Sequence, residues 1–173
     1  HQIELGMDVA LEIKRRIKET LNLTASAGVS YNKFLAKIAS DVRKPDGLFV
    51  LHPLNAPRFV EALPIEDFFG VGAVTAKKMH ALGIKTGKDL KAWNEEALIR
   101  EFGKAGHSYY LYARAIDDRP VNPNRIRKSV GVEETFLNDL NSHDEVVDLL
   151  KMIHAELIRR CRKHDFRGRT LTL

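Results

Sequence analysis

The hydrophobic and polar positions of the first fifty residues alternate between two periods. Residues 7–21 place apolar side chains three or four positions apart, as on one face of an amphipathic helix, whereas residues 23–30 alternate apolar and polar, as in a half-buried strand. A second helical pattern covers about residues 32–43, and a short apolar run at 48–51 predicts another strand. The order helix, strand, helix, strand predicts part of an α/β layer rather than a complete domain.

The pattern changes after Pro53. From there to about residue 116, short helical stretches are interrupted by glycines, which predicts an all-helical subdomain. Residues 117–124 contain two prolines and two asparagines without apolar periodicity, and this composition is typical of a linker.

A third unit follows the linker. Residues 128–136 and 169–173 have the apolar alternation of strands, and a Ser-His-Asp-Glu capping box at 142–145 predicts the start of a long helix between them. This arrangement is a β-α-β piece, and its two strands are too few for a stable sheet without a further partner strand. The expected fold class is therefore α+β with several subdomains.

Composition excludes several functions. The chain has 173 residues, a net charge of +5 and 44% hydrophobic residues, as in an ordinary globular protein. We expect no membrane span and no signal peptide, since apolar runs of about 18 residues are lacking, and we therefore expect a cytoplasmic protein. A lone cysteine, Cys161, excludes an internal disulfide, and the spacing of the histidines excludes a zinc site. Because the chain begins at His1 and ends in a strand pattern, we expect it to be a piece of a longer protein.

Two dense basic clusters, at 125–128 and at 159–169, suggest a polyanionic partner. For the second cluster, a solvated helix end is an equally good interpretation, because cations are favoured near the C-terminus of a helix.

The segment from Phe69 to Lys78 carries the most specific chemistry. A Gly70-Val71-Gly72 turn precedes a helical pattern, so its backbone N–H groups lie at a helix N-terminus, where the helix dipole favours a phosphate. Glycine allows close approach of the backbone, and Lys77 and Lys78 add positive charge. This is the helix-hairpin-helix pattern, which binds the duplex backbone without reading sequence. A helix turn that merely requires glycine is the alternative.

Other motifs predict no chemistry. Residues 83–88 superficially suggest a nucleotide-binding loop, but Asp89 replaces the Ser or Thr that would bind magnesium. The acid pairs at 95–96, 117–118 and 133–134 lie at a helix start, in the linker and on opposite faces of a strand, so they predict no metal site.

Six segments together resemble the Y-family translesion DNA polymerases in their order and spacing. They are residues 26–30, 32–40, 44–47, 70–72, 127–131 and 133–136. The resemblance implies the C-terminal part of a palm (1–51), an all-α thumb with the helix-hairpin-helix (52–117), a linker (118–128) and the N-terminal, β-α-β part of a little finger (129–173).

The resemblance also implies the partners and the site residues. The partners are primer-template DNA, a deoxynucleoside triphosphate and a sliding clamp that is reached through a tail outside this chain. Lys44 resembles the residue that contacts the triphosphate of the incoming nucleotide. The residues that resemble DNA-backbone contacts are Gly70, Val71, Gly72, Thr75 and Lys77 of the thumb, and Arg127, Lys128, Ser129 and Thr135 of the little finger.

In that family the carboxylates that bind Mg²⁺ lie N-terminal to the first helix seen here. We therefore expect neither a catalytic residue nor a metal ligand in this chain, and we expect the chain alone not to polymerise DNA, although the intact protein would. The alternative function is a non-catalytic DNA-binding or scaffold protein built on a helix-hairpin-helix module.

Overall fold

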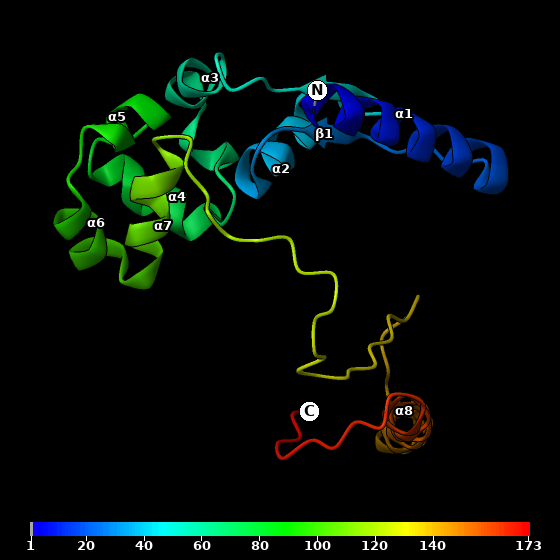
Figure 1. Cartoon of the computed structure of the whole chain (residues 1–173). Coiled ribbons are helices and arrows are strands. Elements are labelled where there is room, and N and C mark those ends of the chain that lie inside the picture. The colour runs from blue at the N-terminus through cyan, green and yellow to red at the C-terminus, as the bar shows by residue number, and fades with distance from the viewer. Residues whose placement is uncertain (1) are drawn as a thin grey trace. The chain divides into compact units, whose positions relative to one another are not determined.

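The computed structural model describes residues 2–173, apart from the side chain of Gln2, and the chain forms two compact units (Figure 1). The first unit ends at Val121, and the second runs from Asn122 to Leu173.

The first unit begins with a small α/β layer. Its elements are α1 (Gln2–Leu21), β1 (Ala27–Val29), α2 (Lys33–Val42) and β2 (Leu48–Val50). The two strands pair in parallel, and α2 forms the crossover that parallel strands require. Gly28 allows α2 to lie close to β1, because a Cβ atom there would stand only 2.2 Å from the carbonyl oxygen of Ala36. The predicted order of elements is confirmed, but β1 is much shorter than the expected strand.

Helix α1 differs from the prediction in two ways. It starts at Gln2 rather than at Met7. Leu11 and Leu21, expected on its inner face, are 47% and 61% exposed. Ala10 and Ile17 are half-buried, so the inner face of α1 is narrower than its apolar pattern suggested.

The rest of the first unit is the helical subdomain. Its elements are α3 (Ala56–Ala62), the 3₁₀ helix η1 (Ile65–Asp67), α4 (Ala73–Ala81), α5 (Gly87–Lys91), α6 (Glu95–Phe102) and α7 (Lys104–Tyr112). The prediction of short helices separated by glycines is confirmed, and the single strand-like feature described here is a bridge between Pro64 and Thr86.

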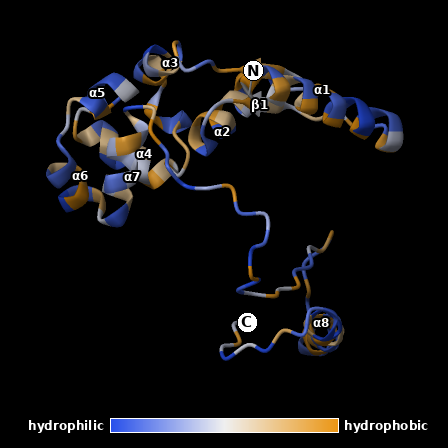
Figure 2. Ribbon diagram, viewed as in Figure 1, coloured by the Kyte–Doolittle hydropathy of each residue, from blue (hydrophilic) through white to orange (hydrophobic). Residues whose placement is uncertain are grey.

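One buried cluster joins α2 to the helical subdomain. The ring of Phe34 stacks on that of Tyr112 with 4.2 Å between centroids, and it lies 5.6 Å from the ring of Phe68. Figure 2 shows hydrophobic and hydrophilic residues sharing each helix, as expected when one face of a helix lies in a core. The α/β layer and the helical subdomain therefore share a core instead of folding as separate bodies.

In the described part of the second unit, α8 (His143–Lys163) is the only regular element, and it has no buried residue. The strands expected at 128–136 and 169–173 are not formed, so the predicted β-α-β arrangement is wrong for this structure. A strand needs a neighbour for its backbone groups, and a two-stranded sheet without a packed face is marginal. The mixed α and β class is confirmed by the first unit.

The start of α8 follows the predicted cap with one change. The Ser142 hydroxyl accepts a hydrogen bond from the Glu145 amide, but the Glu145 carboxylate accepts from the amide of Asn141 rather than from that of Ser142. Across residues 2–173, none of the described helices has both the length and the apolarity that crossing a bilayer demands.

Candidate nucleic-acid interface

The glycine turn leads directly into α4, as the sequence predicts. Gly70 has a φ of +88°, a left-handed conformation that glycine adopts without strain. The amide of Val71 donates to the carbonyl of Phe68 at 3.0 Å and closes the turn. Gly72 is the N-cap residue of α4 and has extended backbone angles. Residues 68–72 are called the hairpin turn below.

The N-terminus of α4 is open. A Cβ atom added to Gly70 or to Gly72 would meet no atom within 4 Å, and no side chain caps the helix. The first amides of a helix have no acceptor within it, and the helix dipole favours an anion there. The backbone at the hairpin turn can therefore donate hydrogen bonds to the oxygens of a phosphate.

The two lysines of α4 differ. Lys77 is exposed and forms no ion pair with any residue that the structure describes. Lys78 lies between α4 and α6, where its ammonium donates to the carbonyl of Glu101 at 2.5 Å, pairs with the Glu101 carboxylate at 3.1 Å and lies over the ring of Phe102. Lys77 is therefore the lysine that remains available to an external anion.

The N-terminus of α5 is closed by its own side chains. The Thr86 hydroxyl accepts from the amide of Asp89, and the Asp89 carboxylate accepts from the amides of Lys85 at 3.0 Å and Thr86 at 2.9 Å. These hydrogen bonds, with the Lys85 amide contributing most, hold the pKa of Asp89 below its ordinary value. The loop at 83–88 thus ends in a capping box, and its acid already uses the amides that a nucleotide phosphate would need.

Lys44 stands in the turn between α2 and β2. Its ammonium lies 2.5 Å from one carboxylate oxygen of Asp41, and the ammonium of Lys37 lies 2.5 Å from the other. Both lysines, Lys37 first, hold the pKa of Asp41 below its ordinary value. Two residues after Lys44, Asp46 forms an ion pair of 2.6 Å with Lys14 of α1, which attaches the turn to that helix. The backbone around Lys44 is fixed while its side chain stays exposed.

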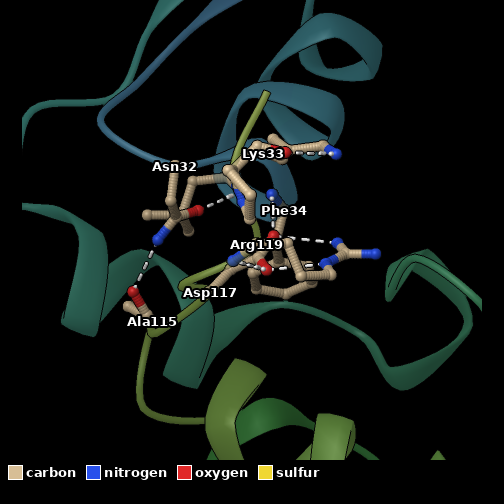
Figure 3. A network of polar contacts seen from close by, with 8 residues as sticks. Asn32, Lys33, Phe34, Ala115, Asp117 and Arg119 are labelled. Carbon is tan, nitrogen blue, oxygen red and sulfur yellow. Dashed lines mark hydrogen bonds and ion pairs between the residues drawn. The ribbon is translucent and has the colours of Figure 1, made fainter. Parts of the chain in front are cut away.

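A network of polar contacts joins the N-terminus of α2 to the segment after α7 (Figure 3). Asn32 accepts from the amide of Leu35 and donates to the carbonyl of Ala115, each at 2.9 Å. The Asp117 carboxylate accepts from the amide of Phe34 at 2.9 Å and binds the guanidinium of Arg119 at 2.7 and 2.8 Å.

Asp117 is therefore a structural acid. Its side chain is only 2% exposed. The hydrogen bond with Arg119 holds the pKa of Asp117 below its ordinary value, although burial opposes this effect. The sequence placed Asp117 in a linker, but the chain stays attached to α2 as far as Pro120, whose carbonyl accepts from Lys33 at 3.3 Å.

Four residues predicted to contact DNA lie in the second unit: Arg127, Lys128, Ser129 and Thr135. All four are exposed, in a segment that is neither helix nor strand. The guanidinium of Arg160 donates to the carbonyl of Gly131 at 2.9 Å and links this segment to α8.

Part of the second basic cluster has partners within α8. Arg159 and Arg160 both bind the carboxylate of Glu156, and their hydrogen bonds, Arg159 first, lower the pKa of Glu156 to about 2. For these two arginines the solvated helix end is the better interpretation.

The acid pair of Glu95 and Glu96 lies in the first turn of α6 behind its cap, Asn94, as expected. Glu95 also pairs with the imidazole of His107 at 2.6 Å. Within residues 2–173, no group of three His, Cys, Asp or Glu side chains is arranged to hold a metal ion.

Comparison with known families matches three parts of the chain. The impB/mucB/samB family matches residues 1–41, its C-terminal domain matches residues 127–173, and the helix-hairpin-helix (HHH) motif of the IMS family matches residues 55–84. The hairpin turn and α4 lie within the last segment. The chain belongs to the impB/mucB/samB family.

Relatives within the impB/mucB/samB family are similar over nearly the whole chain. DNA polymerase IV of Akkermansia muciniphila is 53% identical over 99% of this chain, and DNA polymerase IV of Bacteroides fragilis is 54% identical over the same share. The chain covers 48% and 47% of these proteins, so it spans about half the length of the curated relatives that it matches.

Solved structures confirm the resemblance to Y-family DNA polymerases. A Y-family DNA polymerase chimera of Dbh and Dpo4 is 34% identical, with a TM-score of 0.75 over 91% of this chain and 46% of the chimera. A DinB family error-prone DNA polymerase from Sulfolobus solfataricus is 37% identical, with a TM-score of 0.63 over 69% of this chain and 36% of that protein.

Several residues that support the candidate sites were not predicted from the sequence. Asp41 could have been found from its spacing, because it stands four residues after Lys37 and three before Lys44. Asp117 and Tyr109 gave no such signal, since their partners Phe34 and Gly70 are 83 and 39 residues away in the sequence.

Proposed function

We propose that this chain is part of a DNA-directed DNA polymerase, a nucleotidyltransferase that performs translesion synthesis during DNA repair and replication, and that the chain grips the backbone of the primer-template. The observation that carries the proposal is the 53% identity to a DNA polymerase IV over 99% of the chain. The open hairpin turn supports the same function, because it offers backbone amides and Lys77 to a phosphate.

Binding to the backbone suits this task. Contacts to phosphates fix the position of a duplex but carry no sequence information, so one enzyme can accept any sequence and a distorted template. In the proposed site Gly70, Val71, Gly72, Thr75 and Lys77 hold the primer strand. Arg127, Lys128, Ser129 and Thr135 hold the template strand.

In the same proposal Lys44 contacts the triphosphate of the incoming deoxynucleotide. A lysine ammonium on a flexible stem suits a phosphate group that moves during the reaction. The ion pair of Lys14 with Asp46 supports this role, because it fixes the turn that carries Lys44, while the Lys44 side chain stays exposed.

The division into subdomains is also a proposal. We assign residues 1–51 to the palm, 52–117 to the thumb, 118–128 to a linker and 129–173 to the little finger. The hairpin motif at 55–84 and the C-terminal domain that begins at residue 127 support these boundaries.

The relatives are polymerases, and a divalent metal, which we propose to be Mg²⁺, would stabilise the negative charge of the nucleotide phosphates in the intact enzyme. The described residues do not fit that site, because no three of their His, Cys, Asp or Glu side chains are grouped to hold a metal ion. We assign this chain the binding of DNA and of the triphosphate, and we expect it not to extend a primer alone. A sliding clamp would be a further partner of the intact protein, through a segment outside this chain.

Fluorescence anisotropy tests the binding function. The chain is titrated with labelled primer-template duplex and with single strand at several salt concentrations. We expect duplex binding that does not depend on sequence and weakens steeply with salt. No duplex binding at low salt would contradict the proposed grip.

A primer-extension assay with Mg²⁺ tests the catalytic part. We expect no extension by the chain alone and extension by the protein that contains it. Extension by the chain alone would refute its proposed inactivity, and no extension by the longer protein would favour the non-catalytic scaffold.

A further inference from the structure

We propose that Tyr109 is a positioning residue for the hairpin turn, and that its phenol orients the Gly70 peptide so that the next amides face a DNA phosphate. The inference rests on the proposed DNA grip, because it concerns how that grip is held in shape. Tyr109 lies on α7 and is only 5% exposed. Its hydroxyl donates a hydrogen bond of 3.1 Å to the carbonyl of Gly70.

The hydrogen bond acts on the least constrained residue of the turn. Glycine reaches left-handed angles easily, but it also reaches many others, so a turn at Gly70 has no preference of its own for one orientation. The carbonyl of Gly70 and the amide of Val71 belong to one planar peptide, in which the two groups point in opposite directions. Tyr109 holds the carbonyl, and the Phe68 carbonyl accepts from the amide at 3.0 Å. This peptide is therefore held from both sides.

The held peptide stands directly before the open helix N-terminus. Gly72, the N-cap residue of α4, is the next residue along the chain after Val71. A rotation of the Gly70 peptide would tilt the amides that follow it, so Tyr109 fixes the direction of the groups that are proposed to contact phosphate.

Two features keep the phenol in its role as a donor. Burial raises the pKa of Tyr109, although a hydrogen bond with the Thr75 side chain partly opposes the rise, so the hydroxyl stays protonated at neutral pH. The ring of Phe102 packs edge-on against the ring of Tyr109, with 5.7 Å between centroids, and holds it in place. Through its hydroxyl, Tyr109 contacts Gly70, before the N-terminus of α4, and Thr75, after it.

Tyr112 provides a matched control on the same helix. It is also 5% exposed, its ring stacks on Phe34, and its hydroxyl makes a hydrogen bond with Ser108. These contacts do not involve the hairpin turn. Tyr109→Phe and Tyr112→Phe therefore each remove one buried hydroxyl, but only the first change releases Gly70.

The test measures duplex affinity over a range of salt concentrations, together with Tm, for the wild-type chain and both variants. We expect both variants to lose similar stability, and only Tyr109→Phe to bind duplex about fivefold more weakly, the effect of one lost hydrogen bond. Loss of a phosphate contact would also reduce the salt slope by about one. Amide hydrogen exchange at Val71, whose amide donates to Phe68, should become faster without DNA in Tyr109→Phe alone.

Equal affinity and equal salt slope in wild type and Tyr109→Phe would overturn the inference while leaving the DNA grip intact. A loss of affinity shared by Tyr112→Phe would also overturn it, because the cause would then be general stability. If the wild-type chain binds no duplex at low salt, the proposed function fails, and the inference fails with it.

Discussion

Helices α4 and α5 both begin shortly after a left-handed glycine in the same helical subdomain, yet their N-termini are opposites. At α5, Thr86 and Asp89 form a capping box that uses the local amides. At α4, Gly72 offers no side chain, and the space around Gly70 and Gly72 is open. The sequence shows this difference as the presence or absence of an acid three residues after the cap. When a side-chain carboxylate already accepts from the amides at a helix N-terminus, those amides are not available to a phosphate.

Helix α2 extends the comparison. The first amides of α2 donate hydrogen bonds to two side chains. One is Asn32, directly before the helix, and the other is Asp117, in the segment after α7. The carboxylate at this helix N-terminus therefore comes from a distant part of the chain. It joins two parts of the first unit, and the amides of α2 that it accepts from are not available to an external anion.

The largest expected effect is on stability, at the internally satisfied N-terminus of α2. Asp117→Asn weakens the pair with Arg119 and the bond to Phe34, and we expect a loss of about 2 kcal/mol at neutral pH. Because the pKa of Asp117 is lowered in the folded state, its stabilisation is present above the pKa of an unfolded Asp and is lost as pH falls through the lowered value. Thermal unfolding at several pH values should show wild type and variant converging in acid. A constant difference would contradict this account.

The second prediction converts α4 into a copy of α5. Gly72→Asp places an acid at an N-cap whose extended backbone and free space accept a side chain. We expect a higher Tm, because aspartate is a favourable cap, and duplex binding about tenfold weaker, because the carboxylate competes with phosphate. Anisotropy and thermal unfolding on the same samples measure both effects.

Gly72→Asn is the matched control for that change. It supplies a similar cap without the charge, so Tm should rise while affinity falls less than in Gly72→Asp. Equal affinities for the two variants would show that the charge at the cap is irrelevant.

The third prediction separates the two lysines of α4. Lys77→Ala should weaken duplex binding about threefold and reduce the salt slope by about one, as expected for one phosphate contact. Lys78→Ala should change binding less, because Glu101 already holds the ammonium of Lys78. A larger effect of Lys78→Ala on the salt slope would mean that Lys78 leaves Glu101 to bind DNA.

The smallest effect is expected at α5. Asp89→Asn removes the charge of the capping box, so Tm should fall by a few degrees while duplex affinity stays unchanged. The lowered pKa of Asp89 means that this stabilisation is also lost in acid, so the difference in Tm should disappear there. A change in DNA affinity in Asp89→Asn would mean that the comparison between α4 and α5 is wrong.

Local patterns predicted the helices and the hairpin turn well. The periodicity at 32–43 and the side chain of Asn32 define α2, and the acids behind Asn94 define the start of α6. The strands expected at 128–136 and 169–173 could not be judged in this way, because a strand depends on a neighbour that its own pattern does not specify. The DNA and nucleotide contacts remain predictions.

The sequence by itself determined which helices form, which helix starts carry their own caps and which glycine turn stays open, because these features depend on residues a few positions apart. Tertiary structure decided three contacts between distant residues. Phe34 stacks on Tyr112, the Asp117 carboxylate accepts a hydrogen bond from the first turn of α2, and the Tyr109 hydroxyl donates one to Gly70. The physical reason is the separation along the sequence between the residues that interact. A cap or a helical period is a local hydrogen bond or a local spacing, whereas a buried phenol or carboxylate finds its partner only after the core has brought distant segments together.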